Sequence, residues 1–194
     1  MKNPSFNRAD FYSIIKSRRS VRVYKKDPVP EKLIKKLIEA ATWAPSGKNL
    51  QNWRFFILTG KKKEDYLKLS QKSWLSIKDA LVKKLKPSLY EFTERFFYTL
   101  GEAPVLIFAY SKPNPEEQHQ TSLGSVYMSV QNLLLAANYE GLGTCVMGAP
   151  LEIKDEVNEF LQVKEMDLIC GITLGYPNHE PPAAERRKDH VKFF

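Results

Sequence analysis

Apolar residues recur along this chain in two patterns, which together predict helices interleaved with strands. Apolar positions three and four residues apart predict helices, and short continuous apolar runs predict buried strands. The predicted helices cover residues 10–17, 30–44, 61–100 with a break at Pro87, 122–139 and 150–161. The predicted strands cover residues 53–59, 104–110, 144–148 and 166–175. This order of elements indicates an α+β or an α/β fold.

Two segments depart from a one-sided pattern. The helix at 122–139 is apolar on nearly every face, so we expect it to lie in a core or between two subunits. In the strand at 166–175, Gly171, Thr173 and Gly175 alternate with larger apolar residues. The face that these three small residues line leaves room for a close neighbour, either backbone or a ligand.

Length and composition indicate an ordinary soluble protein. The 194 residues are enough for one sizeable core, and we predict a single domain over residues 1–194. Hydrophobic residues make up 43% and charged residues 27% of the chain. No apolar run approaches the roughly 20 residues of a membrane span. Residues 1–10 hold no apolar segment of the signal-peptide type, so we expect a cytoplasmic protein.

The chain is basic, with 30 lysines and arginines against 22 aspartates and glutamates, a net charge of +8. Such an excess can serve nucleic acid, or an anionic cofactor or substrate. No helix-turn-helix, finger or RNA-binding motif accompanies the charge, so we expect no nucleic acid and no membrane as partner. Cys145 and Cys170 lie in apolar surroundings without CxxC spacing, which predicts buried free thiols. The three histidines are scattered, and we predict no metal site.

Residues 18–22 (RRSVR) place three guanidinium groups and a hydroxyl within five positions. A guanidinium matches a phosphate in two-point contact, so the run can form a compact anion site. In an extended segment alternate residues point to one side. The pattern therefore predicts Ser20 and Arg22 on the side of Arg18, with Arg19 opposite. The alternative is a solvated basic turn.

The connection between the helix at 30–44 and the strand at 53–59 is rich in amides. Pro45, Ser46 and Gly47 end the helix, and Asn49, Gln51 and Asn52 then place three amides within four positions. Side-chain amides both donate and accept hydrogen bonds. Such a cluster suits a flat, heteroatom-rich ligand edge, for example the pyrimidine ring of a flavin. The alternative is an ordinary polar connection.

The motifs that mark self-contained catalysis are missing. We find no GxSxG, no Walker sequence and no fitting Cys-His set, and Gly141 and Gly143 do not complete GxGxxG because Val146 holds the third position. The tail, residues 176–194, carries prolines and then a basic run at 186–188. It either wraps onto a partner subunit, bringing further cations, or forms a disordered basic end. Anion sites without a nucleophile fit a protein whose chemistry a bound phosphorylated cofactor carries.

Four segments together resemble the FMN-dependent nitroreductase family. They are residues 18–22 (RRSVR), 44–55 (APSGKNLQNWRF), 141–148 (GLGTCVMG) and 171–177 (GITLGYP), and they come in the family's order and spacing. The resemblance spans residues 11–188. It implies an α+β fold, a three-layer sandwich with a mostly antiparallel central sheet flanked by helices. It also implies an interlocked homodimer, joined through the helix at 122–139 and exchanged termini, with FMN at the subunit interface.

The same resemblance assigns cofactor-binding roles to positions of this chain. At the N-terminal run, Arg18 and Ser20 match positions that hold phosphate and ribityl, Arg19 lies beside them, and Arg22 matches the cation near flavin N1 and O2. In the amide-rich loop, Pro45, Ser46 and Asn49 match residues that reach FMN from the other subunit, with Gln51 beside them. Further along, Met147 and Gly148 match the segment along the isoalloxazine, and Arg187, or alternatively Arg186, matches a C-terminal phosphate contact.

The resemblance implies an oxidoreductase that takes hydride from NADH or NADPH onto FMN and passes it to a nitroaromatic, quinone or similar acceptor by a ping-pong mechanism. No side chain is implied as the catalytic acid. Residues 61–100 match the acceptor-site or lid region. Flavin-dependent dehalogenases of the superfamily carry a Glu, a Tyr and a Lys there, and their Lys position falls at Phe97, which argues against that activity. The alternative is a flavin-binding or flavin-consuming protein without significant reductase turnover.

Overall fold

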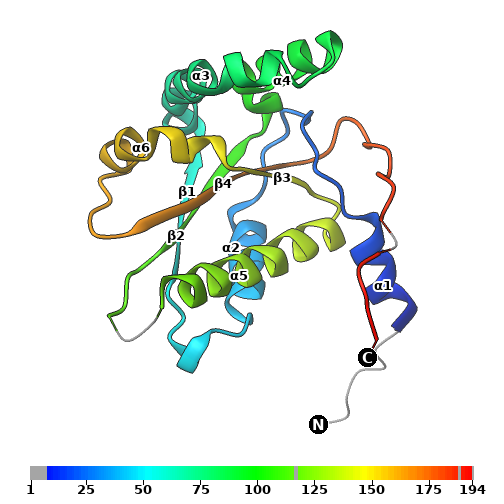
Figure 1. The fold of residues 1–194 in the computed structure, drawn as a ribbon, viewed down its shortest axis with the longest axis vertical. Helices are drawn as coiled ribbons and strands as arrows, with labels where there is room; N and C mark the ends of the chain where they lie inside the picture. Colours follow the sequence, from blue (N-terminus) through cyan, green and yellow to red (C-terminus); the bar gives the residue numbers. More distant parts are fainter. Residues whose placement is uncertain (1–7, 116–117, 188, 194) are drawn as a thin grey trace.

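Four strands form one sheet in the order β1-β2-β4-β3, and each neighbouring pair is antiparallel (Figure 1). The strands are β1 (Trp53–Thr59), β2 (Val105–Ser111), β3 (Gly143–Met147) and β4 (Asp167–Gly175). They belong to a computed structural model that describes residues 8–115, 118–187 and 189–193. The remaining parts of the predicted domain, residues 1–7, 116–117, 188 and 194, lie outside the described residues.

Helices cover both faces of the sheet. They are α1 (Arg8–Ser17), α2 (Glu31–Thr42), α3 (Gly60–Val82), α4 (Pro87–Thr99), α5 (His119–Tyr139) and α6 (Lys154–Leu161). Short 3-10 turns lie at η1 (Gly47–Asn49), η2 (Leu100–Glu102) and η3 (Ala149–Ile153). In Figure 1, α2 and α5 lie on one side of the sheet, and α3, α4 and α6 lie on the other. The predicted α+β fold, a three-layer sandwich around an antiparallel sheet, is therefore confirmed.

Strand β2 shows why the central strands read as unbroken apolar runs. Val105, Ile107 and Ala109 enter the core that α2 and α5 cover. The intervening Leu106 and Phe108 enter the core beneath α3 and α6. All seven residues of β2 are buried, because a strand with helices on both faces has no side for polar residues.

The predicted helix at 150–161 differs from the one observed. The segment begins as the 3-10 turn η3 and continues as α6, and the backbone leaves the helical region at Ile153 (φ −131°) between them. Ile153 is itself buried in the core beneath α3 and α6, so tertiary packing accompanies the interruption. Among the described residues, no helix has the length and apolar character needed to cross a membrane.

Residues 18–25, which we call the arginine arm, cross one end of the sheet and are tied to three separate segments. The amide of Val21 donates to the carbonyl of Thr144 on β3 (2.9 Å), and that of Tyr24 donates to Gly101 in η2 (2.8 Å). The amide of Lys25 donates to the carbonyl of Tyr176, just after β4 (2.9 Å). The arm therefore has a fixed course even though it belongs to no helix or strand.

Small residues beneath the arm permit its close approach. A Cβ at Gly101, where φ is +62°, would lie 2.1 Å from the carbonyl oxygen of Arg22. A Cβ at Gly175 would lie 2.6 Å from Cδ of Pro104 and 3.1 Å from the Tyr24 ring. At Gly175, the neighbour of the small-residue face of β4 is therefore another part of the same chain. The sequence had left open whether that neighbour is protein or a ligand.

We expect Gly101→Ala to destabilise the fold by about 2–4 kcal/mol, because left-handed backbone strain and a clash with the Arg22 carbonyl add together. Gly60→Ala is the matched control, since Gly60 also has a positive φ (+49°) but nothing lies within 4 Å of the added carbon. It should cost only the strain, about 1 kcal/mol. Urea unfolding of both variants measures the difference in the free energy of unfolding. Equal losses would show that the close approach of the arm to Gly101 contributes nothing to stability.

Candidate functional site

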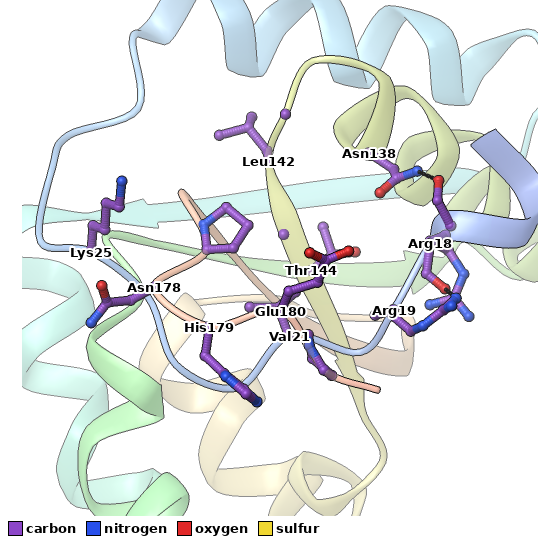
Figure 2. A pocket seen from close by; sticks show the side chains of 15 residues that line it. Arg18, Arg19, Val21, Lys25, Asn138, Leu142, Thr144, Asn178, His179 and Glu180 are labelled. Atoms are coloured by element: carbon purple, nitrogen blue, oxygen red, sulfur yellow. Dashed lines mark hydrogen bonds between the residues drawn. The ribbon is translucent and has the colours of Figure 1, made fainter. Parts of the chain in front are cut away.

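A cavity of about 520 Å³ opens between the arginine arm, the C-terminal end of α5, the start of β3 and residues 177–181 (Figure 2). Arg18 and Arg19 lie together on one side of it, and Lys25 lies on the opposite side beside Asn178. Among the described residues that line it, Glu180 is the single carboxylate. Three full positive charges against one negative charge make the cavity suited to an anion such as a phosphate.

The end of α1 fixes the two adjacent arginines. Asn138 of α5 donates through Nδ2 to the carbonyl of Ile14 (3.1 Å) and to Oγ of Ser17 (2.8 Å), which ties the last turn of α1 to α5. The guanidinium of Arg19 donates to the carbonyl of Lys16 (2.6 Å) and to that of Arg18 (3.0 Å). Arg19 therefore caps carbonyls at the end of the helix as well as lining the cavity.

The predicted sidedness of the basic run is wrong in one respect. Arg18 and Arg19 line the same cavity, whereas Arg22 lines a second, smaller cleft against α4. Arg18 still follows the helix, since its amide donates to the carbonyl of Ile14 (3.2 Å), so the alternation of an extended chain begins only after it. Ser20 is half-buried and forms an isolated parallel bridge with Thr144 of β3.

Cys145 on β3 lies within the field of two arm arginines. Burial raises the pKa of its thiol, while the charge of Arg22, a side-chain hydrogen bond from Arg22 and the charge of Arg18 act in the opposite direction. Burial also raises the pKa of Cys170, to about 12. Both cysteines are buried and neither forms a disulfide within the described part of the chain, which confirms the predicted buried free thiols.

The amide-rich loop is built on a strained backbone. Lys48, Asn49 and Gln51 all have positive φ, of 49°, 56° and 47°. Oγ of Ser46 accepts from the amide of Gln51 (3.0 Å), and Nε2 of Gln51 donates to Oδ1 of Asn49 (3.1 Å). Pro45, Asn49 and Gln51 are exposed and Ser46 is half-buried. Non-glycine residues held in the left-handed region cost energy, and they concentrate at functional sites.

Asn52 differs from the other amides of the loop because it is buried. It is 4% exposed, and its Nδ2 donates to Oγ of Ser111 (2.8 Å) and to the carbonyl of Ser122 (3.3 Å). Its role is to join the loop to β2 and α5. Two of the three clustered amides, Asn49 and Gln51, thus remain available to a ligand.

One chain does not bring the arginine arm and the amide-rich loop together. The loop meets α5 at Ser125, whose Oγ accepts from the amide of Gly47 (3.4 Å). The cavity beside the arm meets α5 at Asn138. Thirteen residues of helix separate these contacts, about 20 Å along the axis. In one chain the two groups therefore contact opposite ends of α5.

The remaining predicted positions lie in mixed surroundings. Met147 is buried, and its Cε would lie 3.1 Å from a Cβ at Gly171, so it offers a ligand its backbone, whereas the neighbouring Gly148 is exposed. Arg186 and Arg187 are exposed and do not line the cavity, which ends at Pro181.

Residue-level reasoning missed several residues that line the two cavities. Lys25 and Asn138 line the larger cavity, and Arg95 of α4 lines the smaller one. The available signal for Arg95 was a cation on an aromatic helix face, between Phe92 and Phe96. Among the described residues, no group of three or more His, Cys, Asp or Glu side chains is arranged to hold a metal ion.

The sequence and the fold of this chain are similar to those of known proteins. The model of the Nitroreductase family matches residues 15–176. An iodotyrosine deiodinase of Thermotoga neapolitana is 32% identical, over 94% of this chain and 96% of the relative. A 4-nitrobenzoate reductase of Nocardioides sp. (strain LMS-CY) is 27% identical, over 90% of this chain and 83% of the relative. A crystal structure of oxidised iodotyrosine deiodinase bound to FMN and 3-iodo-L-tyrosine has a TM-score of 0.76 and 29% identity, covering 95% of this chain and 98% of the other.

We expect both thiols of the native protein to resist modification by a thiol reagent at pH 8. A rise in the pKa of Cys170 from 9.0 to about 12 lowers its thiolate fraction about 1,000-fold, and burial further blocks access. Ellman's reagent should therefore react within seconds in denaturant and far more slowly without it. Cys170→Ala leaves Cys145 as the single thiol and reports on it separately. Rapid labelling of the native protein would contradict the burial of both groups.

Proposed function

Because the chain belongs to the nitroreductase family, we propose that it is an FMN-dependent oxidoreductase that uses NADH or NADPH to reduce a small acceptor such as a nitroaromatic or a quinone. The observation that carries the proposal is the arginine arm, which is fixed at one end of the sheet and lines a cavity with an excess of positive charge. The names of the relatives, which include a reductase of 4-nitrobenzoate and a deiodinase structure that contains FMN, support it.

The chemistry of the residues fits FMN. Arg18 and Arg19, with Lys25 across the cavity, offer the donors that a phosphate requires. Ser20 and its neighbours on the arm would hold the ribityl chain. When bound, FMN would supply hydride acceptance and donation, which none of the chain's own side chains provides. Arg22 would stabilise negative charge at the N1 and O2 edge of the ring, and no side chain need act as the catalytic acid.

We propose that a second copy of the chain completes the site. The loop residues Pro45, Ser46, Asn49 and Gln51 are about 20 Å along α5 from the cavity of their own chain, so they are available to the partner's cofactor. Large apolar residues at the C-terminal ends of α2 and α5 are exposed, among them Trp43 (80%), which directly follows α2, and Tyr139 (69%). Exposed large apolar side chains favour burial against a partner, which supports a homodimer.

Other parts of the chain would complete the contacts. The backbone of Met147 and Gly148, at the end of β3, would lie along the ring. The tail at 176–194, of which residues 188 and 194 lie outside the described residues, would wrap the partner and bring Arg187, or alternatively Arg186, to the phosphate. A single stacking position over the ring would make NAD(P)H and the acceptor alternate, which is a ping-pong mechanism.

Although some relatives are deiodinases, we do not propose deiodination as the activity of this chain. By the family resemblance, Phe97 would hold the position that the dehalogenases of the superfamily fill with lysine. It is 7% exposed and stacks on Trp74, with ring centroids 5.4 Å apart. An apolar core residue there cannot supply the cation that a lysine would offer to the carboxylate of an amino-acid substrate. Reduction of an acceptor that does not depend on a cation at position 97 is therefore the activity that we favour.

Purification under air tests the proposal directly. The protein should be yellow, lose its flavin absorbance when NADH or NADPH is added anaerobically, and regain it when a nitroaromatic or quinone follows. Colourless protein that takes up no FMN and oxidises no NAD(P)H would overturn the proposal. Tight FMN binding without turnover of any acceptor would favour the flavin-binding alternative.

Arg18→Ala and Arg22→Ala should each weaken FMN binding about 10- to 100-fold, because each removes charge-assisted hydrogen bonds. Fluorescence titration of the apoprotein with FMN measures the loss. Lys68→Ala, which removes an exposed cation on α3, is the control and should bind FMN as the unmodified chain does. If both arginine variants retain full affinity, the arm is not the phosphate and ring-edge site.

Complementation between two defective variants should reveal a two-chain site. The first carries Arg18→Ala and Arg22→Ala, and the second carries Asn49→Gly and Gln51→Gly, where glycine tolerates the positive φ of both positions. In an equilibrated equimolar mixture, half of the dimers are mixed and one of their two sites is intact. About a quarter of the unmodified FMN capacity should return. No recovery, although subunit exchange is verified, would place the site within one chain.

A further inference from the structure

The second cavity, a cleft of about 140 Å³, lies between the arginine arm and α4. Arg22 forms part of its wall, and the loop at Gly101 closes it. Arg22 is also the residue proposed above to contact the flavin ring, so the cleft adjoins the place where an acceptor would react. Its volume suits one substituted benzene ring better than a nucleotide.

One face of α4 supplies most of the cleft. Phe92, Arg95, Phe96 and Thr99 follow the spacing of three and four residues that places side chains on a common helix face. Phe92 is 40% exposed and Phe96 is 5% exposed, so an aromatic surface with an open edge is available. The hydroxyl of Thr99 donates to the carbonyl of Arg95 (3.0 Å) and accepts from the amide of Gly101 (3.1 Å).

The charges of the cleft are unbalanced toward the positive. Within the described part of the chain, neither Arg22 nor Arg95 forms an ion pair with a carboxylate, and Arg95 is exposed. Glu102 also lines the cleft, but its carboxylate lies 3.7 Å from Nζ of Lys26. Arg22 and Arg95 both line the cleft, so an anion bound there gains charge-assisted hydrogen bonds from a cation that has no carboxylate partner among the described residues.

We propose that this cleft selects an acceptor that is an aromatic carboxylate, with Arg95 binding the carboxylate and the Phe92–Phe96 face packing against the ring. The proposal rests on the proposed reductase function and narrows its substrate class. A planar guanidinium and a carboxylate form a two-point contact, which a neutral acceptor cannot make. Arg95 is thus a specificity-determining residue, whereas Arg22 serves the cofactor.

Arg95→Gln tests the proposal with a pair of acceptors that differ in one charge, 4-nitrobenzoate and its methyl ester. The substitution should lower kcat/KM for 4-nitrobenzoate about 10- to 100-fold, mainly through KM, and change the value for the ester less than about twofold. Arg95→Lys keeps the charge and should retain more activity on the acid than Arg95→Gln. Lys68→Gln removes one exposed positive charge from α3 and should leave kcat/KM unchanged for both acceptors.

FMN content and thermal stability are measured for every variant, so that a folding defect is recognised. Equal losses on the acid and the ester would overturn the proposal, as would an unmodified enzyme that prefers the ester. A selective change in KM for NADPH would instead assign Arg95 to the nucleotide and would also overturn it. If the unmodified protein reduces neither these acceptors nor a quinone, the proposed reductase function is wrong, and this inference fails with it.

Discussion

The attachment of the arginine arm across the end of the sheet is the constraint on which the rest of the site depends. Three backbone hydrogen bonds, from Val21, Tyr24 and Lys25, reach β3, η2 and the segment after β4. Residues far apart in sequence thereby hold one short extended segment. Tyr24 adds a side-chain anchor, because its buried hydroxyl hydrogen-bonds with Oγ1 of Thr173 (2.8 Å), and burial raises its pKa. The cations at either end of the arm acquire fixed positions as a consequence.

Helix α5 has two roles that follow from its length. It packs its buried face against the sheet and α2, and it separates two groups of ligand-binding character. Asn138 near its end ties down α1 and the first arginines, and Ser125 near its start contacts the amide-rich loop. A helix of this length acts as a spacer within one chain, and in a symmetric pair it would bring complementary ends together.

Much of the architecture could be predicted from residue pattern. The strand at 53–59 is observed as β1 with those bounds, and the break at Pro87 is the start of α4. The single helix expected at 150–161 was wrong at its start, where residues 149–153 form a 3-10 turn and the buried Ile153 lies outside the helical region. Within the candidate site, the basic run and the amide-rich loop were identifiable by composition. The sides to which Arg18 and Arg19 turn were not, because they depend on where α1 ends.

The sequence by itself determined the order and type of the elements and the buried state of both thiols, because burial and periodicity leave a local record in residue type. It also determined which segments carry cations and amides. Only the tertiary structure decided that Asn52 is a buried anchor while Asn49 and Gln51 face outward. It alone placed Arg95 in the same cleft as Arg22, and it alone placed the arm and the loop at opposite ends of α5. These contacts join residues that are far apart in the sequence, and no periodic pattern of residue types in the sequence records them.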